Sequence, residues 1–136
     1  MENKKLLVVA GKRKTSVAKV KIKEGNGEII YNNIPCEKLN LFHKLALLEP
    51  IRIFENVLGK PNFEIKIRTA GGGKESQIQA ARLGIAKALF AVTKSKELRE
   101  AFLKYDKYLL VADSRRKEER KPGDSKARAK RQKSYR

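Results

Sequence analysis

The last 23 residues of the chain, 114–136, contain no leucine, isoleucine, valine or phenylalanine. Eleven of them are Lys or Arg and three are Asp or Glu, so the segment carries a net charge of +8. Such a segment buries too little apolar surface to offset the entropy that is lost on ordering. The sequence therefore predicts an extended basic C-terminal tail over 114–136 that is disordered without a partner.

Residues 1–113 must then supply the folded part of the protein. They hold nearly all the large apolar side chains, and 136 residues with 40% hydrophobic composition suit one core and not two. We expect 1–113 to form a single globular domain that precedes the tail.

The formal net charge of the whole chain is +18 at pH 7. Because charge of one sign destabilises a compact state, we expect a polyanionic partner. The longest apolar run, residues 6–10, is far below the roughly 20 residues that span a bilayer, and the sequence offers no basic amphipathic helix or lipidation signal. The charge therefore favours a nucleic acid and predicts no membrane partner.

Cysteine and histidine are too few for a metal centre. Cys36 and His43 are the single residues of their types, so an internal disulfide and a four-ligand zinc site are both excluded. We expect a cytosolic protein with no metal and no cofactor, in which Cys36 is an unreactive thiol and His43 lies at the surface.

Alternating side chains predict four strands. Residues 15–25 place Ala18, Val20 and Ile22 on one face and lysines on the other, and residues 63–69 alternate in the same way. Two shorter strands are expected at 6–11 and 28–31. The first three of these strands suggest an antiparallel meander.

Helical periodicity predicts the remaining elements. We expect a helix over 37–48 with Leu41, Leu45 and Leu48 facing inward and Pro50 marking its end, then a turn or short helix at 51–59. A long helix over 75–92 is rich in small residues, and a final helix over 95–106 begins at the capping residue Ser95 and faces inward through Leu98, Phe102 and Tyr105. The predicted fold is α+β: a mostly antiparallel four-stranded sheet with helices on one face and a basic opposite face.

One candidate site is the stretch "AGGGKES", residues 70–76, between a strand and a helix. Glycines let backbone amides approach a phosphate, and a helix N-terminus adds partial positive charge. The nucleotide-binding P-loop pattern fails because Arg68 and Glu75 occupy positions that require Gly and Ser or Thr. A loop that holds an RNA phosphate fits better, and the alternative is that the glycines only permit a sharp turn.

A second candidate site is "GKRKTSVA", residues 11–18, at the junction of the first two strands. Lys12, Arg13 and Lys14 are three consecutive cations, and neighbouring hydroxyls such as that of Thr15 can donate hydrogen bonds to phosphate. A polyanion would relieve their mutual repulsion. The alternative is a solvated cationic turn.

Four separated stretches resemble one known family: "GKRKTSVA", "GGGKESQIQAARLGIAKAL", "YDKYLLVADSRR" and the terminal "RAKRQKSYR". In order and spacing they resemble the universal small-subunit ribosomal protein number nine, and the "QKSYR" ending is similar to the archaeal and eukaryotic form. The short chain favours an archaeal source. The resemblance implies a fold like the second domain of small-subunit ribosomal protein five, with a left-handed βαβ crossover.

The resemblance also implies a function. It implies a non-enzymatic structural constituent of the cytoplasmic small ribosomal subunit, bound to ribosomal RNA (rRNA) in the head beside neighbouring head proteins, with no small-molecule substrate. The implied rRNA-binding residues are Lys12, Arg13, Lys14, Thr15, Gly71, Gly72, Gly73, Lys74, Gln77, Arg115, Arg116, Lys117, Arg120, Lys121, Lys126, Arg128, Lys130, Arg131 and Gln132. The tail would reach the peptidyl (P) site, where the anticodon stem-loop of the bound transfer RNA (tRNA) would meet Lys133, Ser134, Tyr135 and Arg136.

Two positions depart from the family pattern. Asn33 stands where members usually have glycine in a turn, and asparagine tolerates the left-handed conformation that such a turn needs. Ser114 replaces a proline between Asp113 and two arginines, which puts the stiffness of the junction between domain and tail in question.

Two other functions fit parts of the sequence. A protein cofactor of an RNA-processing ribonucleoprotein would need a similar charge, and only a ribosomal protein would sediment with small subunits. A phosphotransferase that uses "GGGK" would bind ATP with magnesium.

Overall fold

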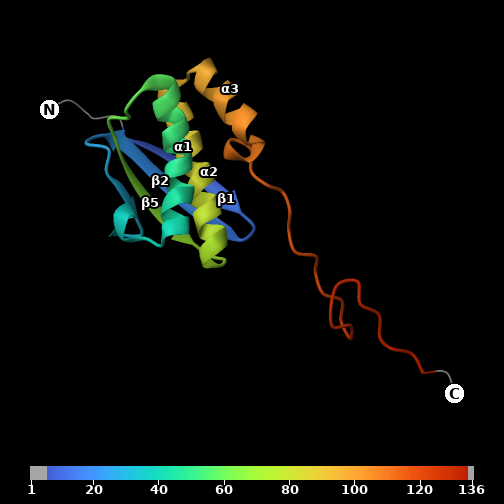
Figure 1. Ribbon diagram of the computed structural model, residues 1–136. Helices are drawn as coiled ribbons and strands as arrows, with labels where there is room; N and C mark the ends of the chain where they lie inside the picture. The colour runs from blue at the N-terminus through green and yellow to red at the C-terminus, as the bar shows by residue number, and fades with distance from the viewer. Residues whose placement is uncertain (1–5, 135–136) are drawn as a thin grey trace.

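The computed structural model of the chain describes residues 6–134 and has an α+β fold. Its elements, in chain order, are β1 (Leu7–Arg13), β2 (Ser16–Glu24), β3 (Ile29–Tyr31), β4 (Ile34–Pro35), α1 (Leu41–Leu58), β5 (Phe63–Ala70), α2 (Lys74–Thr93) and α3 (Lys96–Tyr105). Short 3₁₀ turns lie at Cys36–Lys38 and Lys107–Leu109. Figure 1 shows the three helices gathered on one side of the sheet, as the sequence predicts.

The sheet itself differs from the prediction. It has five strands in the order β1-β2-β5-β3-β4, and β3 runs parallel to β5 while the other neighbouring pairs are antiparallel. The expected mostly antiparallel four-stranded sheet is therefore wrong, and so is a meander of the first three strands, because β5 lies between β2 and β3. The alternation of side chains reports which face a residue occupies and not which strand lies beside it. Strand β4 has only two residues, too few for any pattern.

Strands β3 and β5 and the α1 helix between them form a βαβ unit. Parallel neighbours require such a crossover because their connection must run from one end of the sheet to the other. The left-handed sense of this crossover stays a prediction. The turn after β3 places Asn33 at φ 66°, so asparagine does adopt the left-handed conformation there. The side chain of the neighbouring Asn32 donates a hydrogen bond to the Thr69 hydroxyl of β5 at 2.8 Å and accepts one from the Thr69 backbone amide at 2.9 Å.

Helix α1 does not end before Pro50. It continues to Leu58, and its buried side chains are Leu47, Pro50, Ile51 and Phe54, whereas Leu41 is 62% exposed. The predicted break at Pro50 is wrong. Of the predicted inward stripe, Leu41 and Leu45 are exposed and only Leu48 packs against the core. Proline cannot donate the helical hydrogen bond to the residue four positions earlier, and burial of Pro50, Ile51 and Phe54 offsets this loss.

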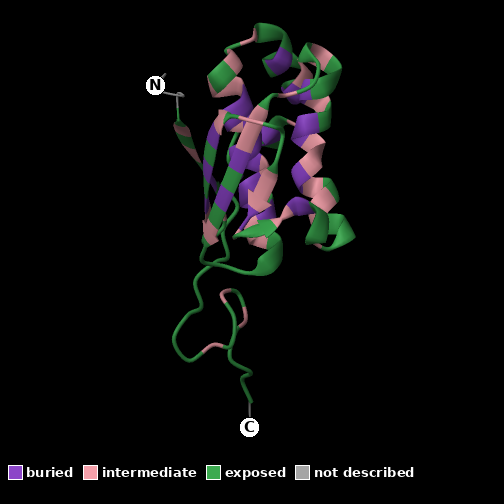
Figure 2. Ribbon diagram, turned by 90° about the vertical axis from the view of Figure 1, so that its left-hand side faces the viewer, coloured by how far each residue is buried: buried purple, intermediate pink, exposed green. Residues whose placement is uncertain are grey.

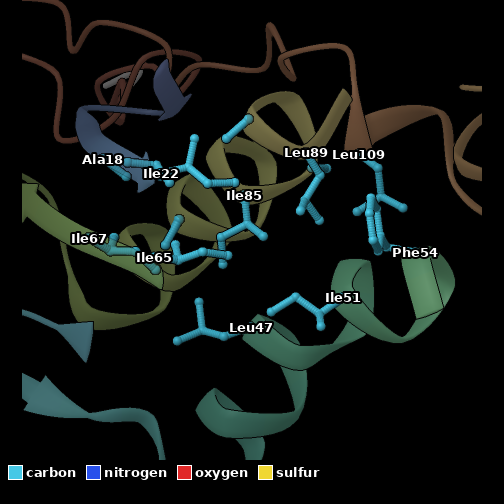
Figure 3. Packing of buried hydrophobic residues seen from close by; sticks show 14 of the residues in the cluster. Ala18, Ile22, Leu47, Ile51, Phe54, Ile65, Ile67, Ile85, Leu89 and Leu109 are labelled. Atoms are coloured by element: carbon cyan, nitrogen blue, oxygen red, sulfur yellow. The ribbon is translucent and has the colours of Figure 1, made fainter. Parts of the chain in front are cut away.

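Helix α2 forms the centre of the core (Figure 3). Its small residues allow a close approach to the sheet, since Ala80, Ala81, Ala86 and Ala88 are all fully buried. A side chain on Gly84 would lie 2.6 Å from Val20 Cγ2 in β2. Helix and sheet therefore pack almost backbone to backbone.

Helix α3 packs on α1 and is capped as predicted. The Ser95 hydroxyl accepts a hydrogen bond from the Leu98 amide at 3.4 Å, and Leu98 and Phe102 are fully buried. Tyr105 was expected to face inward but is 60% exposed. Instead its hydroxyl donates a hydrogen bond to Glu49 of α1, which also pairs with Arg82 of α2.

Residues 114–134 leave the domain after the last 3₁₀ turn and form neither helix nor strand. Figure 1 shows this segment running away from the helices and the sheet. None of its side chains is buried (Figure 2). Its disorder without RNA, and the division at residue 113, stay predictions.

Candidate nucleic-acid interface

The structure brings the two predicted phosphate-binding motifs together. The β1–β2 turn and the glycine loop after β5 lie side by side, and the Ser16 hydroxyl donates a hydrogen bond to the Gly71 carbonyl at 3.0 Å. The Gln77 side-chain amide donates to the same carbonyl, also at 3.0 Å. Ser16 is fully buried although the rest of the turn is exposed. Two stretches that are 55 residues apart thus form one end of the domain.

The three loop glycines have different roles. Gly71 and Gly72 have φ angles of 75° and 63°, and a side chain on Gly72 would overlap the Ser16 hydroxyl. These two glycines are required by backbone geometry alone. Gly73 has a negative φ, and a side chain there would meet nothing within 4 Å. The sharp-turn interpretation therefore accounts for two glycines, and the third leaves open space in front of α2.

The N-terminus of α2 faces this open space. Among residues 6–134 no side chain caps the helix, so the amides of its first turn are free to bind an anion together with Lys74, which is exposed. Glu75 in the same turn accepts a hydrogen bond from His43 at 2.8 Å.

A third predicted segment, the root of the tail, reaches the same end of the domain. Arg116 donates a hydrogen bond to the Lys14 carbonyl in the β1–β2 turn. Asp113, 9% exposed, accepts from Arg13 of β1 and from Arg115, whose Nη2 lies 2.7 Å from Asp113 Oδ2. Arg13 and Arg116, which were both predicted to bind rRNA, thus also hold the tail root against the sheet.

Sequence reasoning missed Asp113 as a residue of this site. Its carboxylate also accepts the Arg115 backbone N–H at 2.9 Å, which is a local turn stabilised by an aspartate side chain. This turn restrains the junction next to Ser114, where the family pattern has proline. The available signal was a lone acid two residues before an Arg pair.

We expect Asp113→Ala to destabilise the protein by about 1–3 kcal/mol, because it removes charge-assisted hydrogen bonds from a largely buried carboxylate. Chemical denaturation measures this loss, and hydrogen exchange of the Arg115 amide should become faster. The matched control is Glu118→Ala, which breaks an exposed pair with Arg128 and should cost less than about 1 kcal/mol. Equal effects of the two variants would contradict the anchoring role of Asp113.

The remaining predicted tail residues lie along an exposed chain. Arg128 is 3.0 Å from Glu118, and the hydrogen bond to that carboxylate raises the pKa of Arg128. Tyr135 and Arg136 lie outside the described residues. The other exposed candidates are Lys117, Arg120, Lys121, Lys126, Lys130, Arg131, Gln132, Lys133 and Ser134.

Residues 6–134 show neither a metal centre nor a membrane span. Within this range no group of three or more His, Cys, Asp or Glu side chains could hold a metal ion. None of the helices described is long and apolar enough to cross a membrane. Cys36 is buried, and this burial raises the pKa of its thiol.

A cationic turn, an uncapped helix N-terminus and an exposed basic segment, all at one end of a small domain, are features of a nucleic-acid-binding protein. The family described as ribosomal protein S9/S16 matches residues 11–136, and the chain belongs to this family. It is 41% identical over 135 residues to small ribosomal subunit protein uS9 of Methanococcus vannielii, covering 97% of this chain and 99% of that protein. It is 42% identical to the protein of the same name from Methanococcus maripaludis, with the same coverage.

These comparisons confirm the resemblance that the four sequence stretches indicated, including its archaeal form. The family is one of ribosomal proteins, so the prediction of a structural protein and not an enzyme is also confirmed.

Proposed function

We propose that the protein is a structural constituent of the small ribosomal subunit, where its domain binds rRNA in the head and its tail extends toward the P-site tRNA. The observation that carries the proposal is the match to small-subunit proteins over nearly the whole chain. The net charge of +18 supplies the electrostatic part of RNA binding.

The end of the domain described above binds the rRNA backbone in this proposal. Lys12, Lys14 and Lys74 are exposed around the joined turn and glycine loop, and they supply the cations. The free amides at the start of α2 add hydrogen-bond donors for a phosphate. Such contacts position a protein on RNA without reading its sequence.

In this proposal the tail extends as a narrow chain toward the tRNA. Fourteen residues from Gly123 to Arg136 span roughly 45 Å when extended, at about 3.3 Å per residue. Small residues between the cations keep this segment thin enough to pass between RNA helices. Arginines bind phosphates bidentately, and Tyr135 stacks on a base or sugar of the anticodon stem-loop.

Protein neighbours in the head are expected at the start of α1. Leu41 and Phe42 are 62% and 77% exposed, and Leu45, one turn further on, is 41% exposed. A contiguous apolar surface of this kind is typical of a protein–protein contact.

Removal of only residues 133–136 tests the role of the terminus. The truncated protein should still sediment with small subunits, because the domain and most tail cations remain. Retention of P-site tRNA by the purified subunits should fall. The matched control is Lys96→Gln with Lys104→Gln, two exposed cations on the helical side of the domain, which should leave tRNA retention intact. Equal tRNA retention by truncated and full-length protein would remove the proposed contact, and failure to sediment with subunits would contradict the ribosomal assignment.

A further inference from the structure

On the sheet face that the helices leave uncovered, the neighbouring strands β2 and β5 both present positive charges. Lys19 and Lys21 of β2 lie directly opposite Arg68 and Lys66 of β5, and all four side chains are exposed. Directly opposed residues in an antiparallel pair have Cβ atoms about 5 Å apart, and like charges at this distance destabilise the sheet. The domain therefore tolerates two repulsive cross-strand pairs on the same face.

Only part of this charge is neutralised within the protein. Glu64 lies 2.8 Å from Lys23 and 3.1 Å from Lys66, and hydrogen bonds to Lys23 first and then to Lys66 lower the pKa of its carboxyl group. Within residues 6–134, Lys19, Lys21 and Arg68 form no ion pair. Of the five cations that β2 and β5 place on this face, three are therefore not neutralised by an acid of the described residues.

The side chains on this face suit the phosphate backbone of RNA and not its bases. The four opposed cations surround a hollow of about 820 Å³ whose apolar lining includes Val17 and Ile30. Those positions of the described strands that point to this side hold no aromatic residue, because Tyr31 and Phe63 lie on the helical side with the core. Base stacking needs an aromatic platform, whereas phosphates need only cations.

The face is continuous with the proposed rRNA-binding end of the domain. Ala70 borders the hollow and is followed at once by Gly71 of the glycine loop, and Val17 lies beside Ser16 of the β1–β2 turn. An RNA strand held at the turn and loop therefore has a charged surface along which it can extend.

We infer that the open face of the sheet is a second RNA-binding surface, where Lys19, Lys21, Lys66 and Arg68 bind the phosphate backbone of rRNA without reading its bases. The inference rests on the proposed function, since it assigns a further contact to the same RNA. Phosphates would neutralise the two repulsive pairs. Loss of Lys19 and Lys21 should therefore weaken RNA binding and stabilise the free protein.

The test is the full-length variant Lys19→Gln with Lys21→Gln, compared with the matched variant Lys96→Gln with Lys104→Gln on α3, which removes the same charge from exposed helical positions. The probe is a transcript of the small-subunit rRNA head, titrated at several salt concentrations. Because each phosphate contact contributes about 0.7–0.9 to the slope of log K against log salt, loss of two contacts should lower this slope by about 1.4–1.8 relative to the control. Its melting temperature without RNA should rise by roughly 2–5 °C.

The outcomes distinguish failure of the proposed function from failure of the second RNA-binding surface. Weak, salt-independent binding by the unmodified protein would overturn the proposed function and this inference together. Tight binding by the unmodified protein, with the same slope for the sheet variant and the control, would overturn the inference alone and leave the face to an acidic protein neighbour. A lower melting temperature for the sheet variant would also count against it, because the lysines would then stabilise the fold.

Discussion

Gly11→Ala should destabilise the domain by more than about 3 kcal/mol, a large share of the 5–15 kcal/mol that holds most domains folded. Gly11 lies in β1 against α2, and a methyl group there would overlap the Ala80 carbonyl oxygen and lie 2.7 Å from the Gly84 amide nitrogen. Both of these atoms belong to a helix backbone, so neither can move aside as a side chain would. Thermal or urea denaturation of the purified variant measures the effect.

The matched control for this substitution is Gly73→Ser. A side chain at Gly73 meets nothing within 4 Å, and serine is a favoured residue before a helix. This variant should melt at the temperature of the unmodified protein or slightly above it. If Gly11→Ala were equally well tolerated, the close packing of β1 on α2 would not be a determinant of stability.

Deletion of residues 123–136 should leave folding intact and greatly weaken RNA binding. None of the described residues in this segment is buried, so the cooperative melt of the domain should persist. The deletion removes six cations, Lys126, Arg128, Lys130, Arg131, Lys133 and Arg136. If each of them neutralises a phosphate, the slope of log K against log salt falls by about four to five.

A second variant separates charge from length in this experiment. Replacement of the same six cations by glutamine keeps a full-length tail and should reproduce the loss of salt dependence. Normal binding by the glutamine variant would show that the tail acts through its length and not its charge. Loss of the cooperative melt on truncation would refute the division between domain and tail.

The candidate site was predictable in its parts but not in its assembly. The cationic turn and the glycine loop each stand out as a short motif, because their residue types are unusual within one stretch of sequence. The hydrogen bond from Ser16 to Gly71 joins them across 55 residues, and the ion pair of Arg13 with Asp113 spans 100. No local pattern reports such distant partners.

The same limit explains the errors in the helices. Pro50 reads as the end of a helix because proline breaks isolated helices, and only the tertiary structure supplies the burial that offsets its missing hydrogen bond. Tyr105 has the helical spacing of the apolar stripe of α3, but its hydroxyl donates to Glu49 on another helix and the ring is exposed.

The sequence by itself determined the excess of positive charge, its concentration in the last 23 residues, and which side chains of β2 and β5 face the helices. These properties follow from composition and from a period of two, which are local. The tertiary structure alone decided that β5 lies between β2 and β3 and so sets Lys19 opposite Arg68 and Lys21 opposite Lys66. Strand order follows from how all the elements bury their apolar faces at once, and this free energy belongs to the whole domain and not to any stretch of it.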